Sequence, residues 1–478
     1  MAESLRHKTL KGTFWSFAER FTAQGIHFLV MIIIAWRLSP KEFGLIGMLA
    51  IFLAVAQSLI DCGFSQALIR KQDRTDTDRN TVFYFNIVVS LLLYLLFYSI
   101  SPWVATFYGE PQLSEIMRVI CLVIVIDSFA VVQRANLVVA IDFKTQTKAT
   151  LIAAVVSGII GIYLAYHGYG VWALVYQLIS SSLMNVIVLW AFSKWYPKLV
   201  YSWKSFRELF GFGSKLMISG LLDTLYRNIY QLVIGKAFSA ESLGHFTNAH
   251  KFSDLPSSNL TTVLQRVTYP ILCTIQDDDE RLALAYRKFL RLSAFIIFPL
   301  MCGLAAVSYP LIELVLGENW HYAAIILVPL CFQMMWYPIH SINLNLLQVK
   351  GRSDLFLRLE IIKKFIGVTI LFCSLPFGLL AMCYTGIFSS VLCLAINTYY
   401  TGKLIKVGFF MQMKDISATL FLSLMMFGLV FYGISMIDGN VLKLISGITG
   451  GGFFFIALSL MLKLKELSYI RDLVNNER

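Results

Sequence analysis

Charge is scarce in this sequence. Only 14% of the 478 residues are Asp, Glu, Lys or Arg, whereas 58% are hydrophobic and the mean hydropathy is +0.70. Such a balance excludes an ordinary soluble domain. The eight cysteines show neither metal-ligand nor disulfide spacing. Long polar loops are lacking too, and short outer connections such as 108–115 and 167–169 leave no room for a folded domain. We therefore expect a polytopic membrane protein.

Apolar stretches of about 20 residues, long enough to cross a hydrocarbon core of about 30 Å, recur along the whole chain. They predict an all-α membrane protein with about 14 transmembrane helices. The expected spans are 13–37, 42–64, 82–107, 116–141, 149–167, 169–193, 212–236, 243–272, 286–310, 322–348, 359–376, 378–402, 415–437 and 440–462.

The formal charge of +12 is unevenly distributed along the chain. If the N-terminus lies in the cytosol, most of the 40 Lys and Arg residues fall in loops on that same side. This positive-inside pattern predicts a multi-pass protein with both termini in the cytosol. The charge is then a topology signal and an attraction to anionic lipid headgroups, and no nucleic-acid partner is expected.

Residues 38–44 (LSPKEFG) are similar to residues 238–244 (FSAESLG). Both segments join an apolar span that carries polar residues to the next span, and six spans separate them. This pattern predicts two six-helix lobes in a parallel pseudo-two-fold repeat, residues 1–205 and 206–405. Residues 406–478 would add two peripheral, lipid-facing helices and a cytosolic tail. The alternative is a chance similarity between two helix–turn–helix junctions.

Ionisable residues nevertheless lie inside several predicted spans. In the first span, Arg20, Gln24 and His27 fall on one narrow stripe of the helix, with Glu19 at its side. A charge at the centre of a bilayer costs about 2.5–3.5 kcal/mol, so these side chains must face each other or water. One explanation is a set of interhelical ion pairs that only fix packing. The other is an aqueous cavity shared by the two lobes.

The charges concentrate in the first, fourth, seventh and eighth spans, which favours the cavity. Its cationic side chains outnumber its carboxylates, and arginine suits phosphate oxygens, so we expect an anionic cargo. The predicted substrate-binding residues are Arg20, Gln24, His27, Arg134, Arg227, Gln231, Lys251 and Arg266. Because buried carboxylates can titrate or hold Na⁺, the candidates for ion coupling are Glu19, Asp127 and Asp223. No catalytic residue, metal ligand or cofactor is predicted beyond a coupling H⁺ or Na⁺.

Seven segments together carry a family resemblance: LSPKEFGLIGM (38–48), DCGFSQALIRK (61–71), VQRANLVVAIDFK (132–144), YGVWALVYQ (169–177), LGHFTNAHKFSDLPSSNL (243–260), RVTYPIL (266–272) and GRSDLFLRLEIIKK (351–364). With them the chain resembles the polysaccharide-transporter branch of the multidrug/oligosaccharidyl-lipid/polysaccharide (MOP) exporter superfamily. It is similar in particular to the Wzx-type, WzxC-like lipopolysaccharide flippases. The resemblance covers most of residues 10 to 405.

The resemblance implies a MATE-like fold whose two six-helix lobes rock about a central, cation-rich cavity. It implies a flippase for an undecaprenyl-diphosphate-linked oligosaccharide, a repeat unit of lipopolysaccharide, O-antigen, capsule or exopolysaccharide. The cargo would pass from the cytosolic to the periplasmic leaflet of the bacterial inner membrane. The implied partners are this lipid-linked oligosaccharide, membrane lipid and a glycan polymerase or export machinery.

Two other functions stay open. One is a MATE-like antiporter for drugs or other small molecules, although the cationic excess in the predicted cavity would repel organic cations. The other is a membrane enzyme of glycan assembly, such as a ligase or polymerase, which usually exposes a large outer loop or an acidic metal-binding motif. Neither feature is present in the sequence, so we expect a transporter and no enzyme.

Overall fold

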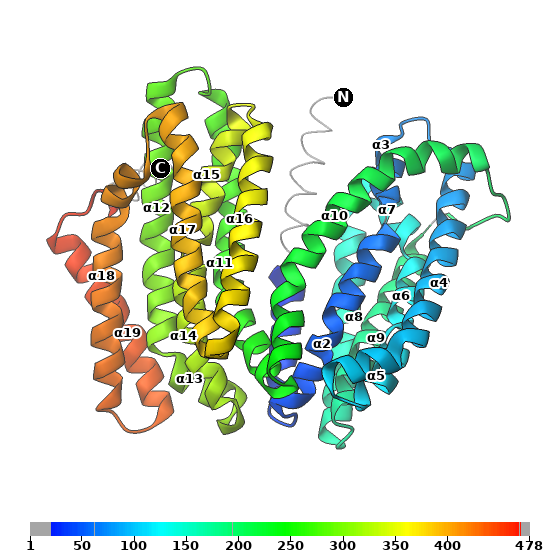
Figure 1. Ribbon diagram of the computed structural model, residues 1–478, viewed down its shortest axis with the longest axis horizontal. Helices are drawn as coiled ribbons and strands as arrows, with labels where there is room; N and C mark the ends of the chain where they lie inside the picture. The colour runs from blue at the N-terminus through cyan, green and yellow to red at the C-terminus, as the bar shows by residue number, and fades with distance from the viewer. Residues whose placement is uncertain (1–20, 62, 194, 468, 470–478) are drawn as a thin grey trace. The chain divides into compact units, whose positions relative to one another are not determined.

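The computed structural model describes residues 21–61, 63–193, 195–467 and 469. Throughout these residues the chain forms helices joined by turns and short connections, with no β-strand (Figure 1). Nine helical stretches in the described part are long and apolar enough to cross a membrane. The predicted all-helical membrane fold is confirmed, whereas the count of about 14 spans stays a prediction.

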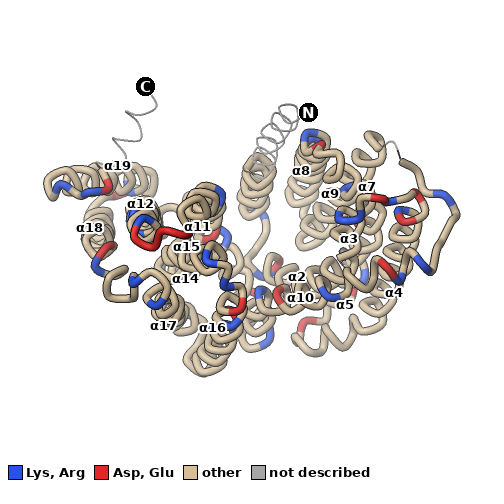
Figure 2. Tube along the Cα trace, turned by 90° about the horizontal axis from the view of Figure 1, so that it is seen from above, with Lys and Arg blue, Asp and Glu red and all other residues tan. Residues whose placement is uncertain are grey.

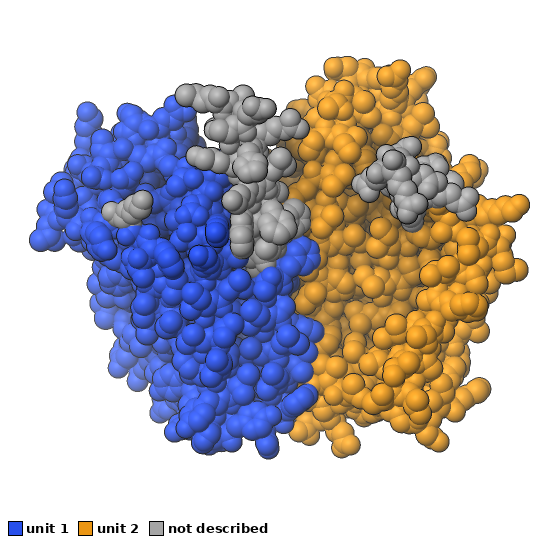
Figure 3. Space-filling model, turned by 180° about the vertical axis from the view of Figure 1, so that it is seen from behind, with its two compact units in different colours: residues 1–244 blue, residues 245–478 orange. Residues whose placement is uncertain are grey.

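The chain divides into two compact units, residues 1–244 and 245–478 (Figure 3). The predicted lobe boundary after residue 205 stays a prediction. In the first unit, the helical residues Phe21–Ala35 precede α2 (Pro40–Asp61), α3 (Phe64–Arg70), α4 (Asp76–Tyr108), α5 (Gln112–Ile120), α6 (Leu122–Ser128), α7 (Val131–Val139), α8 (Phe143–Tyr166), α9 (Val171–Phe192), α10 (Trp203–Ala237) and the start of α11 (Ala240–Thr274).

Helix packing in the first unit is mostly between long apolar neighbours. Helix α8 packs along α9, and α10 packs along α2. The predicted span 116–141 is instead divided into α5, α6 and α7 by tight turns at Cys121 and at Phe129. The indole N–H of Trp190 donates a hydrogen bond to the carbonyl oxygen of Phe129 (3.0 Å), so α9 holds the second turn.

Local side-chain hydrogen bonds determine where α4 begins and ends. The hydroxyl of Thr75 accepts a hydrogen bond from the backbone N–H of Asp78 (3.2 Å), and the carboxylate of Asp78 accepts one from the N–H of Thr75 (2.8 Å). This capping box satisfies two of the donors that a helix N-terminus leaves unpaired. The helix ends at Gly109, whose φ of 74° is a left-handed conformation that glycine adopts without strain.

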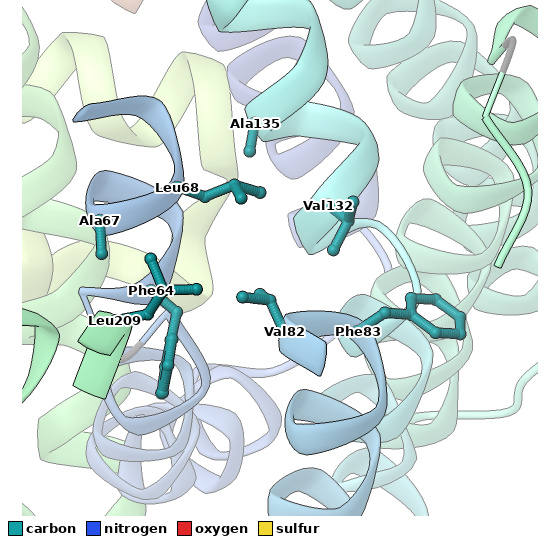
Figure 4. Close-up of a cluster of buried hydrophobic side chains, with 8 residues drawn as sticks. All are labelled: Phe64, Ala67, Leu68, Val82, Phe83, Val132, Ala135 and Leu209. Carbon is teal, nitrogen blue, oxygen red and sulfur yellow. The ribbon is translucent and has the colours of Figure 1, made fainter. Parts of the chain in front are cut away.

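Four helices of the first unit meet in a cluster of buried apolar side chains, contributed by α3, α4, α7 and α10. Figure 4 shows these residues, which are Phe64, Ala67, Leu68, Val82, Phe83, Val132, Ala135 and Leu209. The cluster anchors the two short helices α3 and α7 against the two long ones. Short helices are unstable in isolation, and the burial of apolar area stabilises their packing against neighbours.

Polar residues at the start of α4 hold the connection between α9 and α10. The side-chain oxygen of Asn80 accepts a hydrogen bond from the N–H of Lys198 (2.9 Å), and the hydroxyl of Thr81 accepts one from the N–H of Ser202 (3.1 Å). Both α4 side chains are buried. The extended connection thus gains the hydrogen bonds that it cannot make within a helix.

Lys71 lies between α3 and α4 and bridges two acidic residues. Its Nζ is 3.2 Å from the Asp78 carboxylate of α4 and 3.0 Å from the Glu208 carboxylate of α10. Burial opposes the charged form, but the hydrogen bonds to Glu208 and Asp78 outweigh it and raise the pKa of Lys71 above its usual value. This residue therefore joins the ends of two helices that are far apart in sequence.

The described part of the second unit contains the rest of α11 and eight further α-helices with two short 3₁₀ helices between them. They are α12 (Asp279–Ala306), α13 (Ser308–Leu316), η1 (Glu318–Trp320), α14 (His321–Met334), α15 (Tyr337–Val349), α16 (Ser353–Ser374), η2 (Leu375–Phe377), α17 (Leu379–Ile405), α18 (Phe409–Ser435) and α19 (Asn440–Met461). Helix α12 packs along α18, α18 against α19, and α17 against α14 and α16. An acidic run, residues 277–280, leads into α12 (Figure 2), where Asp278 caps the helix by accepting from the N–H of Arg281 (3.1 Å).

Helix α18 begins with polar contacts to its neighbours. The side-chain amide of Gln412 exchanges two hydrogen bonds with that of Asn343 in α15 (both 3.1 Å) and donates to the hydroxyl of Thr401 in α17 (3.0 Å). Asp415 accepts hydrogen bonds from both Arg287 and Arg291 of α12. One face of the first two turns of α18 is therefore buried against other helices, whereas Phe410 and Met411 are exposed. The lipid-facing position expected for residues 406–478 stays a prediction.

Candidate substrate site in the membrane-spanning helices

Asp127 and Arg134 lie together where α6 meets α7. Arg134 Nη2 is 3.7 Å from Asp127 Oδ1, and the Ser182 hydroxyl of α9 donates a hydrogen bond to the same carboxylate. Ser182 lies near the middle of α9, whose 22 residues are long and apolar enough to cross a membrane. The group therefore lies close to mid-membrane depth, where an uncompensated charge is costly.

Exposure distinguishes the two partners of this ion pair. The Asp127 side chain is 16% exposed and that of Arg134 is 33% exposed. The carboxylate is thus enclosed by its partners, whereas part of the guanidinium remains accessible. Because a guanidinium has five N–H donors and this pair uses few of them, Arg134 can also bind an anionic group.

Helix α10 carries three of the predicted site residues, Asp223, Arg227 and Gln231. Arg227 Nε is 2.7 Å from Asp223 Oδ2, and their side chains are 73% and 44% exposed, respectively. The Gln231 side-chain oxygen is buried without a hydrogen-bond partner in the described part of the chain. An exposed pair contributes little to stability, so fixing the packing does not explain these charges. Helix α10 is not among the nine described stretches that are long and apolar enough to cross a membrane, so the predicted span 212–236 stays a prediction.

The first predicted span is described only from residue 21 onward. Glu19 and Arg20, two of its predicted site residues, lie outside the described residues. Gln24 is partly buried, and its side-chain oxygen has no hydrogen-bond partner among the residues that the structure describes. His27 is exposed.

Helix α11 carries the remaining predicted residues, Lys251 and Arg266, whose side chains are both exposed. Two asparagines of the same helix, Asn248 and Asn259, are buried, and each has a side-chain oxygen without a partner among the described residues. Buried amides are normally hydrogen-bonded, so oxygens without a partner indicate that the polar residues of α11 have a role other than packing. A chamber shared with the first unit stays a prediction.

Helix α16 contains a charged pair that the sequence analysis did not include. Lys363 Nζ is 2.5 Å from Glu360 Oε1, and both side chains are mostly buried. Lys363 lies near the middle of the 22-residue helix. In the sequence, a dense run of charges from 350 to 364 resembles a cytosolic loop, which conceals that the helix begins at Ser353. The sequence therefore gives no sign that Lys363 lies in the middle of a helix.

The described residues contain no group of three or more His, Cys, Asp or Glu side chains able to hold a metal ion. The charged pairs described above offer electrostatic chemistry. Arginine and lysine side chains paired with single carboxylates can exchange that partner for a phosphate or another anion. Such exchange needs an accessible cation, which Arg134 and Arg227 provide in the first unit.

Residues 33–325 match the model of a protein family described as "Polysaccharide biosynthesis protein". The chain belongs to this family. One relative is TuaB, a teichuronic acid biosynthesis protein of Bacillus subtilis, which is 30% identical over 63% of this chain and 62% of TuaB. A second is ExoT, a succinoglycan biosynthesis transport protein of Rhizobium meliloti, which is 26% identical over 68% of this chain and 66% of ExoT. A third is WzxC, a lipopolysaccharide biosynthesis protein of Escherichia coli, which is 24% identical over 76% of this chain and 75% of WzxC. The chain therefore spans somewhat less than two thirds of TuaB and ExoT.

The fold of this polysaccharide family member is similar to that of the lipid II flippase MurJ in an inward closed conformation. The TM-score is 0.77 at 15% sequence identity, over 97% of this chain and all of the MurJ chain. At this identity the likeness concerns the fold alone. The family match confirms the predicted resemblance to polysaccharide biosynthesis proteins, and the fold is like that of a flippase.

Proposed function

We propose that this protein is a flippase for an undecaprenyl-diphosphate-linked oligosaccharide. The cargo moves from the cytosolic to the periplasmic leaflet of the bacterial inner membrane, and both chain termini lie in the cytosol. Membership of a polysaccharide biosynthesis family supports a glycan cargo. The observation that carries the proposal is the accessible Arg134, which lies beside an enclosed carboxylate near mid-membrane depth.

The diphosphate of the carrier lipid is the chemical group that suits such arginines. It has several anionic oxygens, and a guanidinium binds two of them in a planar fork. In a low-dielectric setting this attraction offsets the loss of hydration as the headgroup enters the protein. The sugar part needs water and hydroxyl partners, which the polar residues of α10 and α11 supply. The lipid tail stays in the bilayer.

Ion coupling belongs to the same proposal. Of the described carboxylates, Asp127 is the best candidate because three elements, α6, α7 and α9, meet at its side chain. Protonating it would release Arg134 for the cargo, and deprotonating it would restore the pair. A gradient of H⁺ or Na⁺ would then shift the balance between the state in which Arg134 is paired with Asp127 and the state in which Arg134 is free to bind cargo. Asp223 is the second candidate, and Glu19 the third.

The test is transport in reconstituted vesicles. Purified protein is placed in liposomes with a fluorescent undecaprenyl-diphosphate-linked glycan, and a membrane-impermeant reagent reports the label that reaches the opposite leaflet. We expect protein-dependent transfer that accelerates when a proton or sodium gradient is imposed. Transfer of organic cations instead would indicate a drug antiporter, and extension of the glycan would indicate an enzyme. In cells, deletion of the gene should leave lipid-linked repeat units on the cytosolic leaflet.

A further inference from the structure

A small pocket opens at one end of the first unit, away from the charged residues described above. Its volume is about 300 Å³, at the lower end of the range of ligand pockets. Four segments build it: the start of α2, the first turn of α5, the turn between α8 and α9, and the start of α9. The lining residues that carry side-chain chemistry are Glu42, Gln112, Glu115, Tyr169 and Trp172.

Glu42 has a fixed position in the wall of this pocket. Its Oε2 accepts hydrogen bonds from the backbone N–H (2.6 Å) and the hydroxyl (3.1 Å) of Ser39, which precedes α2. Its Oε1 lies against Gly170, where an added Cβ would come within 2.6 Å. Gly170 also has a φ of 56°, in the region that favours glycine. The backbone at residue 170 therefore allows the carboxylate to approach closely.

The charge in the pocket has one sign. Glu42 and Glu115 are both acidic, and no lysine or arginine lines it. The neighbouring Lys41 is paired with Glu110 at 3.1 Å, outside the lining. The side chains of Gln112 and Glu115 are exposed, so their polar atoms are available. An anionic ligand would be repelled, whereas donors such as hydroxyl or ammonium groups would be attracted.

Aromatic rings complete the lining. Tyr169 is 53% exposed in the turn between α8 and α9, and Trp172 is half-buried at the start of α9. Aromatic rings offer a large apolar face with a polar handle at the edge. Carboxylates and amides that surround such a face match a pyranose, which has apolar C–H faces and a rim of hydroxyl groups. A divalent cation fits less well, because it needs six or more oxygen ligands and no acidic or His/Cys group of three occurs in the described residues.

We infer that this pocket binds one or two sugar residues of a glycan, neutral or amino-substituted but not acidic. The inference rests on the proposed function, since the pocket lies at the end of the unit where the predicted periplasmic connections 108–115 and 167–169 meet. The pocket is then a second contact for the glycan, separate from the arginines of the candidate site. It would bind the sugar chain after the headgroup has crossed the membrane. Glu115 supplies the acceptor for the amino or hydroxyl groups, and Tyr169 supplies the apolar face.

The experiment uses the full-length protein in lipid nanodiscs and three lipid-free probes: a glucosamine disaccharide, lactose and a disaccharide that contains glucuronic acid. Binding is titrated by saturation-transfer NMR, with calcium chloride titrated in parallel by calorimetry. The variants are E115Q and Y169A, and the matched control is E110Q, which makes the same chemical change outside the lining. We expect millimolar binding in the order glucosamine, lactose, glucuronate. E115Q should weaken glucosamine binding about fivefold or more, because it removes the charge-assisted bond.

Several outcomes overturn the pocket assignment: no saturable binding of any probe, tightest binding of the acidic disaccharide, equal effects of E115Q and E110Q, or Glu115-dependent calcium binding without sugar binding. A failure of Y169A to weaken lactose binding removes the stacking role. The vesicle transport assay separates this inference from the proposed function. Wild-type protein that transports no lipid-linked glycan, yet binds the disaccharides through Glu115, would refute the flippase and leave the pocket intact.

Discussion

Gly44 of α2 lies directly against the carbonyl oxygen of Ala240, the first residue of α11. The contact has a reciprocal counterpart, because Gly244 lies against the carbonyl oxygen of Pro40, the first residue of α2. Residues 40 and 44 thus exchange roles with residues 240 and 244. Such reciprocity is expected of a duplicated junction, and the duplication itself stays a prediction.

Replacing either glycine at this contact should destabilise the protein. A Cβ at position 44 or 244 would collide with backbone atoms, which cannot rotate away as a side chain can. We expect G44A and G244A each to cost about 1–3 kcal/mol of unfolding free energy, as overpacking does. Thermal unfolding of the purified protein in detergent measures this loss.

Gly211 of α10 provides the matched control, since nothing lies within 4 Å of its added Cβ. G211A should be neutral or should stabilise the helix by up to about 1 kcal/mol, because alanine is the better helix former. Equal unfolding temperatures for G44A, G244A and G211A would contradict the close backbone contact.

Asp127 and Arg134 provide the test of the intramembrane site. Each single variant, D127N or R134Q, leaves one charge unpaired in a low-dielectric position and should reduce transport about tenfold or more. The double variant D127N/R134Q removes both charges and should recover most of the lost stability. It should not recover transport, because the cargo then has no guanidinium to bind.

Vesicle transport and thermal unfolding of these three variants, measured side by side, separate a functional pair from a structural one. R281A is the control, because Arg281 is 78% exposed and pairs with Asp278 at the start of α12. It should transport like the wild type. A double variant that transports normally would mean that the pair serves packing only. Alanine variants at Arg20 and Arg227 extend the same test and should insert normally but export poorly.

Helix positions could be predicted well where the apolar period was uninterrupted. The predicted span 440–462 matches α19, Asn440–Met461, almost to the residue. The break inside 322–348 lies at Met335 and Trp336, two residues before Pro338 in the first turn of α15, so a breaker residue is present there. The breaks inside 116–141 could not be predicted, because their turns contain Cys121 and Phe129 rather than glycine or proline. Without a local breaker residue, such turns depend on tertiary packing, for example the hydrogen bond from Trp190 to Phe129.

The candidate site could be predicted in part. Asp127, Arg134, Asp223 and Arg227 were all identified as candidates from their positions in apolar spans, and they form two ion pairs, Asp127 with Arg134 and Asp223 with Arg227. Ser182 could not be predicted, because a hydroxyl in an apolar span gives no sign of a partner fifty-five residues away. Lys363 was obscured by neighbouring charges that resemble a loop. Composition indicates which helices are polar, whereas the partner of each polar group depends on packing between distant segments.

Lys71 should stabilise the protein in a pH-dependent way. K71M leaves the buried Asp78 without its cationic partner and should cost about 1–3 kcal/mol at pH 8. The pKa of Lys71 is raised in the folded state from 10.5. The stabilisation is therefore complete below the unfolded pKa and is lost as the pH rises through the higher folded pKa.

The difference in unfolding free energy between wild type and K71M should accordingly stay constant from pH 8 to about pH 10 and shrink as the pH rises above 10.5. K41M is the control, because Lys41 is 53% exposed and its pair with Glu110 should contribute less than about 1 kcal/mol. A K71M penalty that stays constant up to pH 11 would show that the ammonium charge is not what stabilises the junction of α3, α4 and α10.

Asp415 should be among the most sensitive positions of the second unit, because it holds two arginines of α12 and thereby fixes the start of α18. It accepts from Arg287 at 2.6 and 2.7 Å as well as from Arg291, and its own side chain is only 2% exposed. D415N leaves two neighbouring guanidinium groups without a counter-charge, which should cost about 3–5 kcal/mol. Asp354 offers a matched comparison, since it also accepts two hydrogen bonds from one arginine, Arg352, but at 63% exposure.

D354N should therefore change the unfolding free energy by less than about 1 kcal/mol, because water screens and replaces an exposed pair. The two variants carry the same chemical change on a bidentate acceptor, so the difference between their unfolding temperatures isolates the effect of burial. If D415N unfolds at the same temperature as D354N, the start of α18 is held by the apolar contact with α12 and by the Gln412 hydrogen bonds instead. In that case Q412A, which removes the bonds to Asn343 and Thr401, should produce the larger loss.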